Sequence, residues 1–402
     1  AGSLCAGVGF TGFAAAVPLP GLLGNEVRRM AGTKGLKITK VEVYALSVPL
    51  KEPFTISLGT MTAAENVLVR IHTDGGLVGV GECSPFIFID GQTQKMVFNL
   101  ARDVAKVLVG KDALAVDARL AEIERAAPGN STMKSAYDLA LFDLLGKAAG
   151  LPLWVLLGGG GQQDLHTDLT ISINTPEVMA RKARELLAQG FTKVKTKVGR
   201  ATELDVAAIR AIREAVGPSV PIQVDANQGW DVPTALRTLE ALAQYDVMYC
   251  EEPIRRGDLD GLRYVREHSP IPIMADESVF DHKDAFRIAA LGAADYFNIK
   301  LSKSGGIANA LRITAIADAA AMKCQVGCMQ ETRLALTALA HVAAAKSCII
   351  FYDLDSALFH AEDPVVGGLV YGERGSVKLP DGPGIGADVD PAFLRRMEKV
   401  TV

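Results

Sequence analysis

Strand-like runs recur at a regular spacing in the middle of the chain. Between residues 192 and 300, five short runs of mainly apolar or β-branched residues each end in a charged residue. The charged ends are Lys197, Asp225, Glu251, Asp276 and Lys300, separated by 28, 26, 25 and 24 residues. Each interval has the length of one strand, one helix and two loops. The pattern therefore predicts a repeated strand-helix unit.

The segments between these runs have the periodicity of amphipathic helices, for example residues 203–216 and 232–245. Strands joined by crossover helices lie parallel, so their charged ends meet at one rim of the sheet. Further runs at residues 166–172, 323–328 and 349–353 bring the number of strands to eight. Eight such strands predict a closed (β/α)8 barrel of the TIM type, which carries its functional residues at the carboxyl ends of its strands.

The order of the strands predicts which charged residues face one another. In an eight-stranded barrel the second and sixth strands lie on opposite walls. Lys197 ends the second strand and Lys300 follows the sixth, so we expect their amines to face each other across the mouth. Asp225, Glu251 and Asp276 then lie on the three walls between them.

A different pattern precedes the barrel and predicts a second domain. Strand-like runs around an Asp-Gly-Gly turn indicate an antiparallel meander, and helical patterns follow it. The runs occupy residues 38–44, 67–73 and 77–81, and the helical patterns occupy residues 94–108, 116–125 and 132–149. We expect an α+β capping domain over residues 37–160, the barrel over residues 161–355, and a C-terminal segment over residues 356–402 that returns to the cap.

Two loops of the capping domain carry apolar residues, at residues 53–61 and 86–91. Loops of this kind close over a barrel mouth as lids. Phe54 and Gly59 of the first loop are predicted to line the pocket for the side chain of a substrate.

The first 36 residues differ from the rest of the chain. Residues 1–17 are small, apolar and uncharged, and the first charge is Glu26. This composition resembles the apolar core and cleavage region of an export signal. The other interpretation is an extension without a role in the fold. The first interpretation predicts a periplasmic protein and the second a cytoplasmic one.

Composition excludes some partners. The chain has 402 residues and is 49% hydrophobic, which is enough for a large core and two domains. The net charge is −4 without a basic run, so nucleic acid and anionic membranes are not expected partners. The cysteines lack the spacing of metal or redox motifs and are predicted to be buried free thiols. They are Cys5, Cys83, Cys250, Cys324, Cys328 and Cys348.

The three carboxylates predict a metal site. Asp225, Glu251 and Asp276 on adjacent strand ends form an all-oxygen cluster, which suits Mg²⁺ or, as a substitute, Mn²⁺. Three unpaired carboxylates at one site repel one another, and a divalent cation compensates for this. The alternative is that each residue only caps the helix after its strand.

Two further pairs at i and i+2 place like charges on one face of a strand. Repulsion between Lys195 and Lys197 is expected to lower the proton affinity of Lys197 and make it usable as a base. Asp353 and Asp355 at the eighth strand could hold an ammonium group. The alternatives are a solvated strand for the lysines, and one capping and one solvated carboxylate for the aspartates.

The motifs of this chain resemble those of a known superfamily. Lys195-Thr-Lys197, Asp225-Ala-Asn227, Glu251-Glu-Pro253, Asp276-Glu-Ser278 and Lys300 are similar, in this order, to motifs of the muconate-lactonizing subgroup of the enolase superfamily. In this superfamily a lysine or histidine base works with Mg²⁺. The Asp353-Leu-Asp355 segment resembles that of the dipeptide epimerases, and so does the segment with Cys328 and Met329.

The resemblance implies a Mg²⁺-dependent epimerase of dipeptides. Lys197 and Lys300 would exchange the α-proton from opposite faces of an enediolate, with Lys195 neutralising the bound carboxylate. Asp353 and Asp355 would bind the substrate's ammonium group. Asn227, Glu252 and Glu277 would support the metal ligands from behind. Gly59 stands where members specific for glutamate have an arginine, which favours an apolar second residue in the substrate.

Other functions are compatible with the same residues. An N-acylamino-acid racemase, a cycloisomerase or a hydroxyproline-type dehydratase would use the same metal and lysines. A non-catalytic, metal-dependent binding protein is a further alternative, although both bases and all three ligands are present. The resemblance also implies a homo-oligomer.

Overall fold

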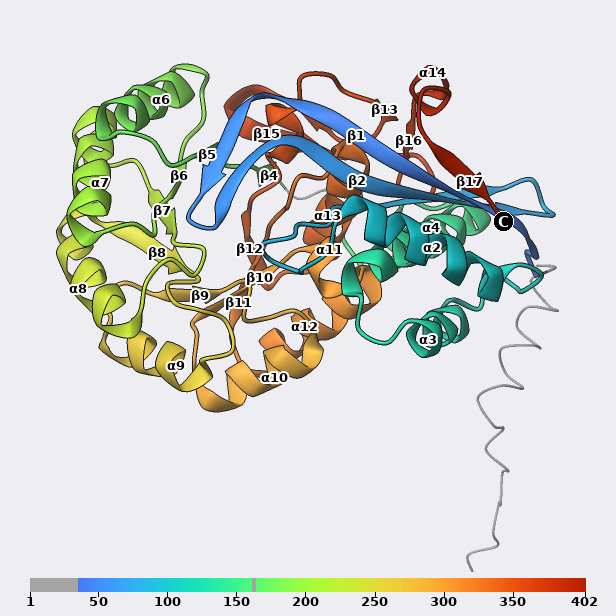
Figure 1. Ribbon diagram of the computed structural model, residues 1–402, viewed down its shortest axis with the longest axis horizontal. Helices are drawn as coiled ribbons and strands as arrows, with labels where there is room; N and C mark the ends of the chain where they lie inside the picture. Colours follow the sequence, from blue (N-terminus) through green and yellow to red (C-terminus); the bar gives the residue numbers. More distant parts are fainter. Residues whose placement is uncertain (1–34, 161–163) are drawn as a thin grey trace, which may run out of the picture.

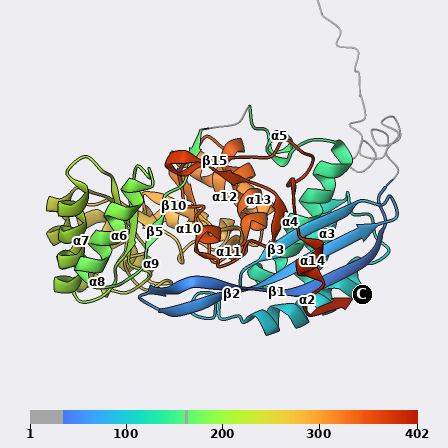
Figure 2. The same ribbon diagram turned by 90° about the horizontal axis from the view of Figure 1, so that it is seen from above.

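The computed structural model describes residues 35–160 and 164–402. Residues 1–34 of the predicted leader lie outside the described residues. Figure 1 shows a ring of parallel strands and helices beside an antiparallel sheet with its own helices. A long hairpin formed by two strands of the antiparallel sheet extends along one side of the ring. Figure 2 shows this hairpin with the molecule seen from above. No helix among the described residues is long and apolar enough to cross a bilayer.

The ring is an eight-stranded parallel sheet with its strands in sequence order. The strands are β5 (Thr170–Ile171), β6 (Val194–Lys197), β7 (Ile222–Asp225), β8 (Val247–Glu251), β9 (Ile273–Ala275), β10 (Tyr296–Ile299), β11 (Lys323–Val326) and β12 (Ile349–Tyr352). The amide of Asp168, just before β5, donates to the carbonyl of Tyr352 on β12 at 3.2 Å, so the first and last strands meet. The predicted barrel is confirmed.

The first strand is shorter than predicted. The run at residues 166–172 splits into β4 (Leu165–His166) and β5, and β4 pairs with β15 (Ser376–Lys378) instead of joining the barrel. The segment between them is held by single backbone bonds, such as that from the Thr167 amide to the carbonyl of Gly375 at 2.8 Å, and by side-chain bonds, instead of a continuous ladder. The Thr167 hydroxyl accepts the amide of Leu354 at 2.8 Å. Prediction of one continuous strand was wrong here because tertiary contacts override the local pattern.

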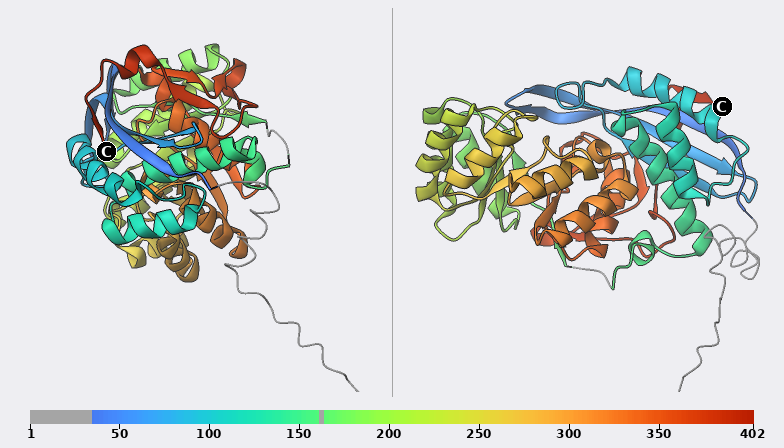
Figure 3. Two further views of the ribbon diagram at one scale, coloured as in Figure 1. Left: turned by 90° about the vertical axis from the view of Figure 1, so that its right-hand side faces the viewer. Right: turned by 90° about the horizontal axis from the view of Figure 1, so that it is seen from below.

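Helices surround the barrel on the outside (Figure 3). They are α6 (Pro176–Ala188), α7 (Thr202–Val216), α8 (Val232–Leu242), α9 (Leu259–His268), α10 (His282–Leu291), α11 (Leu301–Ser304), α12 (Ile307–Ala319) and α13 (Arg333–Ala345). Side chains cap the start of several of them, as Asp231 does for α8 and Asp281 for α10. Capping of this kind contributes about 1 kcal/mol per helix.

The capping domain is built on an antiparallel sheet in the order β17-β1-β2-β3. Its strands are β1 (Ile38–Ile56), β2 (Gly59–Thr73), β3 (Val78–Cys83) and the C-terminal β17 (Lys399–Thr401), and its helices are α2 (Gln94–Leu108), α3 (Val116–Ala126) and α4 (Ser131–Ala149). The pairing of β17 with β1 brings the end of the chain back to the cap, as expected. The domain limits given above remain a prediction.

Helix α4 lies between the capping sheet and barrel helices α11 and α12. It packs closely on β3 because Gly79 and Gly81 have no side chains. A Cβ atom at Gly81 would lie 2.1 Å from the carbonyl oxygen of Ala136. Asp138 of α4 accepts the amide of Ile307 at the start of α12, at 2.5 Å. This helix therefore fixes the cap on the barrel.

The first predicted lid is not a loop. β1 and β2 continue through it as a hairpin, with Phe54 opposite Met61 and Ile56 opposite Gly59. The turn has only two residues, and the apolar residues beside it bury a small cluster of their own. Alternating apolar residues in this stretch explain why it extends the sheet. The second lid, residues 86–91, is an irregular turn as predicted.

The remaining elements are short. They are α5 (Leu153–Leu156), η1 (Ala243–Tyr245), η2 (Ser356–Phe359), β13 (Val365–Gly367), β14 (Val370–Tyr371), η3 (Glu373–Gly375), β16 (Ala387–Val389) and α14 (Pro391–Leu394). β13 pairs with β16, and β14 with β15, so the tail is folded along the barrel and the cap.

Candidate active site

The three predicted metal ligands come together at the carboxyl ends of neighbouring strands. Asp225 ends β7, Glu251 ends β8 and Asp276 follows β9. All three are fully buried, and one carboxylate oxygen of each lies within 4.8 Å of the other two. Three buried carboxylates without a sulfur or imidazole ligand are a donor set that fits Mg²⁺.

The two predicted bases approach this cluster from different strands. Lys197 Nζ lies 2.6 Å from Asp225 Oδ2, and Lys300 Nζ lies 2.6 Å from Asp276 Oδ2. β6 and β10 are four places apart in the sheet, so the lysines flank the cluster from two sides. Burial by itself would lower the pKa of Lys300, but the charges of Asp276 and Glu251 outweigh it and hold the pKa well above its usual range.

Lys195 has a different environment from the one predicted. Its Nζ lies 2.8 Å from Glu251 Oε2 and 2.7 Å from Asp353 Oδ2, and it is fully buried. Burial would lower the pKa of Lys195, but Asp353 and Glu251 raise it well above its usual range. The expected repulsion with Lys197 is therefore offset, because two carboxylates from other strands neutralise Lys195.

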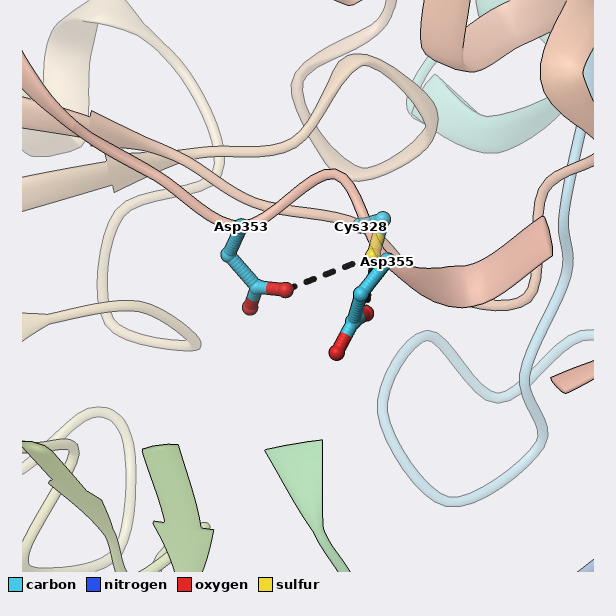
Figure 4. Close-up of side chains that lie close together, drawn as sticks. All are labelled: Cys328, Asp353 and Asp355. Atoms are coloured by element: carbon cyan, nitrogen blue, oxygen red, sulfur yellow. Dashed lines mark hydrogen bonds between the residues drawn. The ribbon is translucent and has the colours of Figure 1, made fainter. Parts of the chain in front are cut away.

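Asp353 and Asp355 lie beside Cys328, which comes from the loop after β11 (Figure 4). The Cys328 thiol donates to Oδ1 of both, at 3.7 Å and 3.4 Å. The Oδ2 atoms have other partners. Asp353 Oδ2 accepts a hydrogen bond from Lys195 Nζ, and Asp355 Oδ2 accepts one from the Thr170 amide, at 2.7 Å each. Burial and the charge of Asp353 raise the pKa of Asp355 to about 7.

A cavity of about 290 Å³ opens between the lids and the barrel mouth. Lys197 and Lys300 line it, and so do apolar side chains of the lids and the loop after β11. The predicted residues Phe54, Cys328 and Met329 are among those that line it. Gly59 is not among the described residues that line it. Cys83, Cys250, Cys324 and Cys348 are buried free thiols as predicted, whereas Cys328 is only partly buried.

The three residues predicted to support the ligands form hydrogen bonds around them. The Asn227 amide donates to Asp225 Oδ1 at 2.8 Å, and its side chain donates to Glu277 Oε1 at 3.1 Å. Glu252 accepts the Asp276 amide at 2.7 Å. Burial raises the pKa of Glu252 to about 7. Asn227 and Glu252 have φ of +39° and +35°, strained values of a kind that concentrates at functional sites.

Three polar residues that the sequence did not predict for the site contact the predicted ligands. Lys303 is fully buried and its Nζ lies 2.6 Å from Asp276 Oδ1. Glu251 accepts from Asn298 at 2.8 Å and from Gln325 at 3.1 Å. Asn298 precedes Lys300 by two positions, and Gln325 stands between the apolar residues Cys324 and Val326 in the buried part of its strand. A polar residue in a buried strand was the available signal.

Known proteins are similar to this chain in both sequence and fold. A family described as "Enolase C-terminal domain-like" matches residues 178–393, and the "Mandelate racemase / muconate lactonizing enzyme, N-terminal domain" matches residues 38–158. A D-Ala-D/L-Ala epimerase of Cytophaga hutchinsonii is 46% identical over 365 residues, which cover 91% of this chain and 99% of that protein. A hydrophobic dipeptide epimerase of Enterococcus faecalis is 40% identical over 352 residues, 87% and 99% of the two chains.

A solved structure agrees with these matches. The crystal structure of a dipeptide epimerase from Cytophaga hutchinsonii, in complex with Mg and the dipeptide D-Ala-L-Val, has a TM-score of 0.90 at 46% identity and covers 91% of this chain and 100% of that one. The resemblance seen in the motifs is thus confirmed. The chain belongs to the enolase superfamily, as a two-domain member of the mandelate racemase and muconate lactonizing enzyme family in its dipeptide epimerase group.

Proposed function

We propose that this chain is a Mg²⁺-dependent isomerase that epimerises dipeptides by moving one α-proton between two bases. The observation that supports it most directly is the placement of Lys197 and Lys300. Both line one cavity, and each reaches a different edge of a buried carboxylate cluster. An α-carbon held between two amines can lose its proton to one of them, become planar, and receive a proton from the other on the opposite face, which inverts the centre.

The charges around the cavity support this chemistry. Asp225, Glu251 and Asp276 would hold the Mg²⁺ ion. When bound, the ion would offset the negative charge that the substrate's carboxylate gains as the α-proton leaves. Lys195, fixed between Glu251 and Asp353, keeps a positive charge next to the same position. The lysines accept and return the proton, and the lids exclude water.

Two features favour a dipeptide with a free amino group and apolar side chains. The Oδ1 atoms of Asp353 and Asp355 converge and are free to accept from an ammonium group once the Cys328 thiol is displaced. Among the described residues, the basic side chains that line the cavity are Lys197 and Lys300, so an acidic side chain would lack a further cation. The names of the two relatives, which specify D-Ala-D/L-Ala and hydrophobic dipeptides, agree with this choice.

Incubation in D₂O tests the proposal. The protein with Mg²⁺ is mixed with a library of apolar dipeptides, and mass spectrometry reads deuterium at the α-carbon while chiral chromatography reads inversion. We expect both signals with free dipeptides and weak signals with their N-acetyl forms. Turnover confined to N-acyl amino acids would favour the racemase alternative. If no α-proton exchange occurs with either Mg²⁺ or Mn²⁺, the chain is a non-catalytic binding protein.

Two further expectations belong to the same proposal. The resemblance implies a homo-oligomer, which light scattering of the full chain measures. The compartment is periplasmic if residues 1–36 act as an export signal and cytoplasmic otherwise, and fractionation of cells distinguishes them.

A further inference from the structure

The two lids touch at a glycine. Gly59 begins β2, directly after the turn of the hairpin. A Cβ atom built on Gly59 would lie 2.7 Å from Cε2 and 3.0 Å from Cζ of Phe88, which belongs to the second lid. Real Cβ atoms do not approach other atoms this closely. The ring of Phe88 therefore occupies the space that any side chain at position 59 would need.

Phe88 stands between the hairpin and the substrate cavity. Its ring lines the cavity, and 51% of the residue is exposed. It also packs edge-on against Phe86, with ring centres 5.4 Å apart. A half-exposed aromatic ring at a cavity wall offers an apolar surface that a ligand's side chain can cover. Such a contact is apolar and does not require a charged group on the ligand.

Each lid is tied to the barrel independently. The Ser57 hydroxyl at the hairpin turn donates to the carbonyl of Asn227, beside the metal ligands, at 2.7 Å. The Arg256 guanidinium donates to the carbonyl of Ile89 in the second lid at 2.8 Å. These bonds hold both lids relative to the catalytic lysines. The contact between Gly59 and Phe88 then sets where the ring lies within the cavity.

We propose that Phe88 is a specificity-determining residue, that its position depends on the missing side chain at Gly59, and that its ring forms the wall against which an uncharged apolar side chain of the dipeptide packs. The inference rests on the proposed function for its substrate class. Gly59 then affects substrate binding through the position of the Phe88 ring and does not contact the substrate itself.

A double-mutant cycle tests this. The variants are Phe88→Ala, Gly59→Ala and their combination, with Gly382→Ala as the matched control because nothing lies within 4 Å of a Cβ there. For L-Ala-L-Leu we expect Phe88→Ala to raise KM about tenfold, since burying an apolar side chain on the ring is lost, with kcat little changed. Gly59→Ala should raise KM by a similar factor, because the ring must move away.

The double variant shows whether the two substitutions act through the same contact. Once Phe88 is alanine, Gly59→Ala should add less than about a twofold change, because the two residues act through one contact. Additive effects of the two substitutions, or a KM unchanged in Phe88→Ala, would overturn the inference. Phe88→Leu, which keeps an apolar side chain, should lie between the wild type and Phe88→Ala. Thermal unfolding of each variant shows whether it is folded.

Direct binding separates this inference from the proposed function. Calorimetric titration of L-Ala-L-Leu into the wild type and Phe88→Ala, with Mg²⁺ present, measures affinity without turnover. If the wild type exchanges no α-proton but binds the dipeptide about tenfold more tightly than Phe88→Ala, the epimerase function fails and the inference stands. If the wild type turns over dipeptides and both proteins bind them equally, the inference fails alone.

Discussion

Replacing Lys197 and Lys300, the two proposed bases, one at a time should separate proton exchange from epimerisation. Lys197→Gln and Lys300→Gln keep a polar side chain of similar length but remove the amine. Each variant should lose about 10²- to 10⁴-fold in epimerisation, the usual contribution of a general base. That loss corresponds to about 3–5 kcal/mol in the activation barrier. Each variant should still exchange the α-proton of one stereoisomer with solvent, because the remaining lysine can remove and return it on its own side.

The structure also predicts how the two variants differ in stability. Asp276 has two amines, Lys300 and Lys303, so Lys300→Gln leaves one of them in place. Lys197→Gln removes the amine that lies 2.6 Å from Asp225 Oδ2, leaving Oδ1 with the Asn227 amide. Leaving a buried charge without its partner costs about 3–5 kcal/mol. Without Mg²⁺ the Lys197 variant should therefore unfold at the lower temperature.

The assay uses each pure stereoisomer of L-Ala-L-Leu and L-Ala-D-Leu in D₂O. Proton NMR follows loss of the α-proton signal, chiral chromatography follows inversion, and calorimetry follows unfolding. Lys323→Gln, an exposed lysine at the start of β11, is the control and should behave as the wild type. Full epimerisation in either active-site variant would refute the reasoning. Retention of exchange from the same stereoisomer by both variants would also contradict two bases on opposite faces.

Three further predictions concern the ammonium site, the metal and a buried histidine. Asp355→Asn should raise KM for free dipeptides about tenfold or more while leaving N-acetyl dipeptides unchanged, because a charge-assisted hydrogen bond contributes about 1.5–3 kcal/mol. In the wild type the same KM should fall as the pH rises through about 7, where Asp355 ionises. Removal of metal with a chelator should abolish α-proton exchange and lower the unfolding temperature, and Mg²⁺ at a hundred times its Kd should restore about 2.7 kcal/mol of stability, as calorimetry measures. His341 is buried between the amide of Trp154 and the carbonyl of Ile385, and burial lowers its pKa to about 4. The unfolded chain binds a proton there near pH 6.5, so stability should fall by up to about 3 kcal/mol as the pH drops from 6.5 to 4, and His341→Gln should show less of this loss.

The barrel and the kinds of residue at its mouth follow from the sequence. Strand-helix units of nearly constant length must be parallel, and parallel strands bring their carboxyl ends to one rim. This is why Asp225, Glu251 and Asp276 were expected together, and why Lys197 and Lys300 were expected on opposite sides. The relation between chain position and place in the barrel is fixed by backbone geometry alone.

The pairing of the charged groups was decided by the tertiary structure. Lys195 was expected to repel Lys197, yet it binds Asp353, which lies 158 residues away in the chain. Lys303 was not expected in the site, although it follows Lys300 by one helical turn and binds the same carboxylate. Which amine meets which carboxylate depends on side chains from several strands packing at once, and no local pattern encodes that.

The lids show the same division. Sequence predicted two apolar segments near the mouth, but the first extends the sheet as a hairpin, whereas the second is an irregular turn. Gly59 and Phe88 were 29 positions apart with no periodic relation, so their contact appears only when both segments are tied to the barrel. Spacing along the chain set the architecture and the chemical groups, because it acts through the backbone. Close contacts between distant side chains set the shape of the cavity, because they depend on where every neighbouring segment comes to rest.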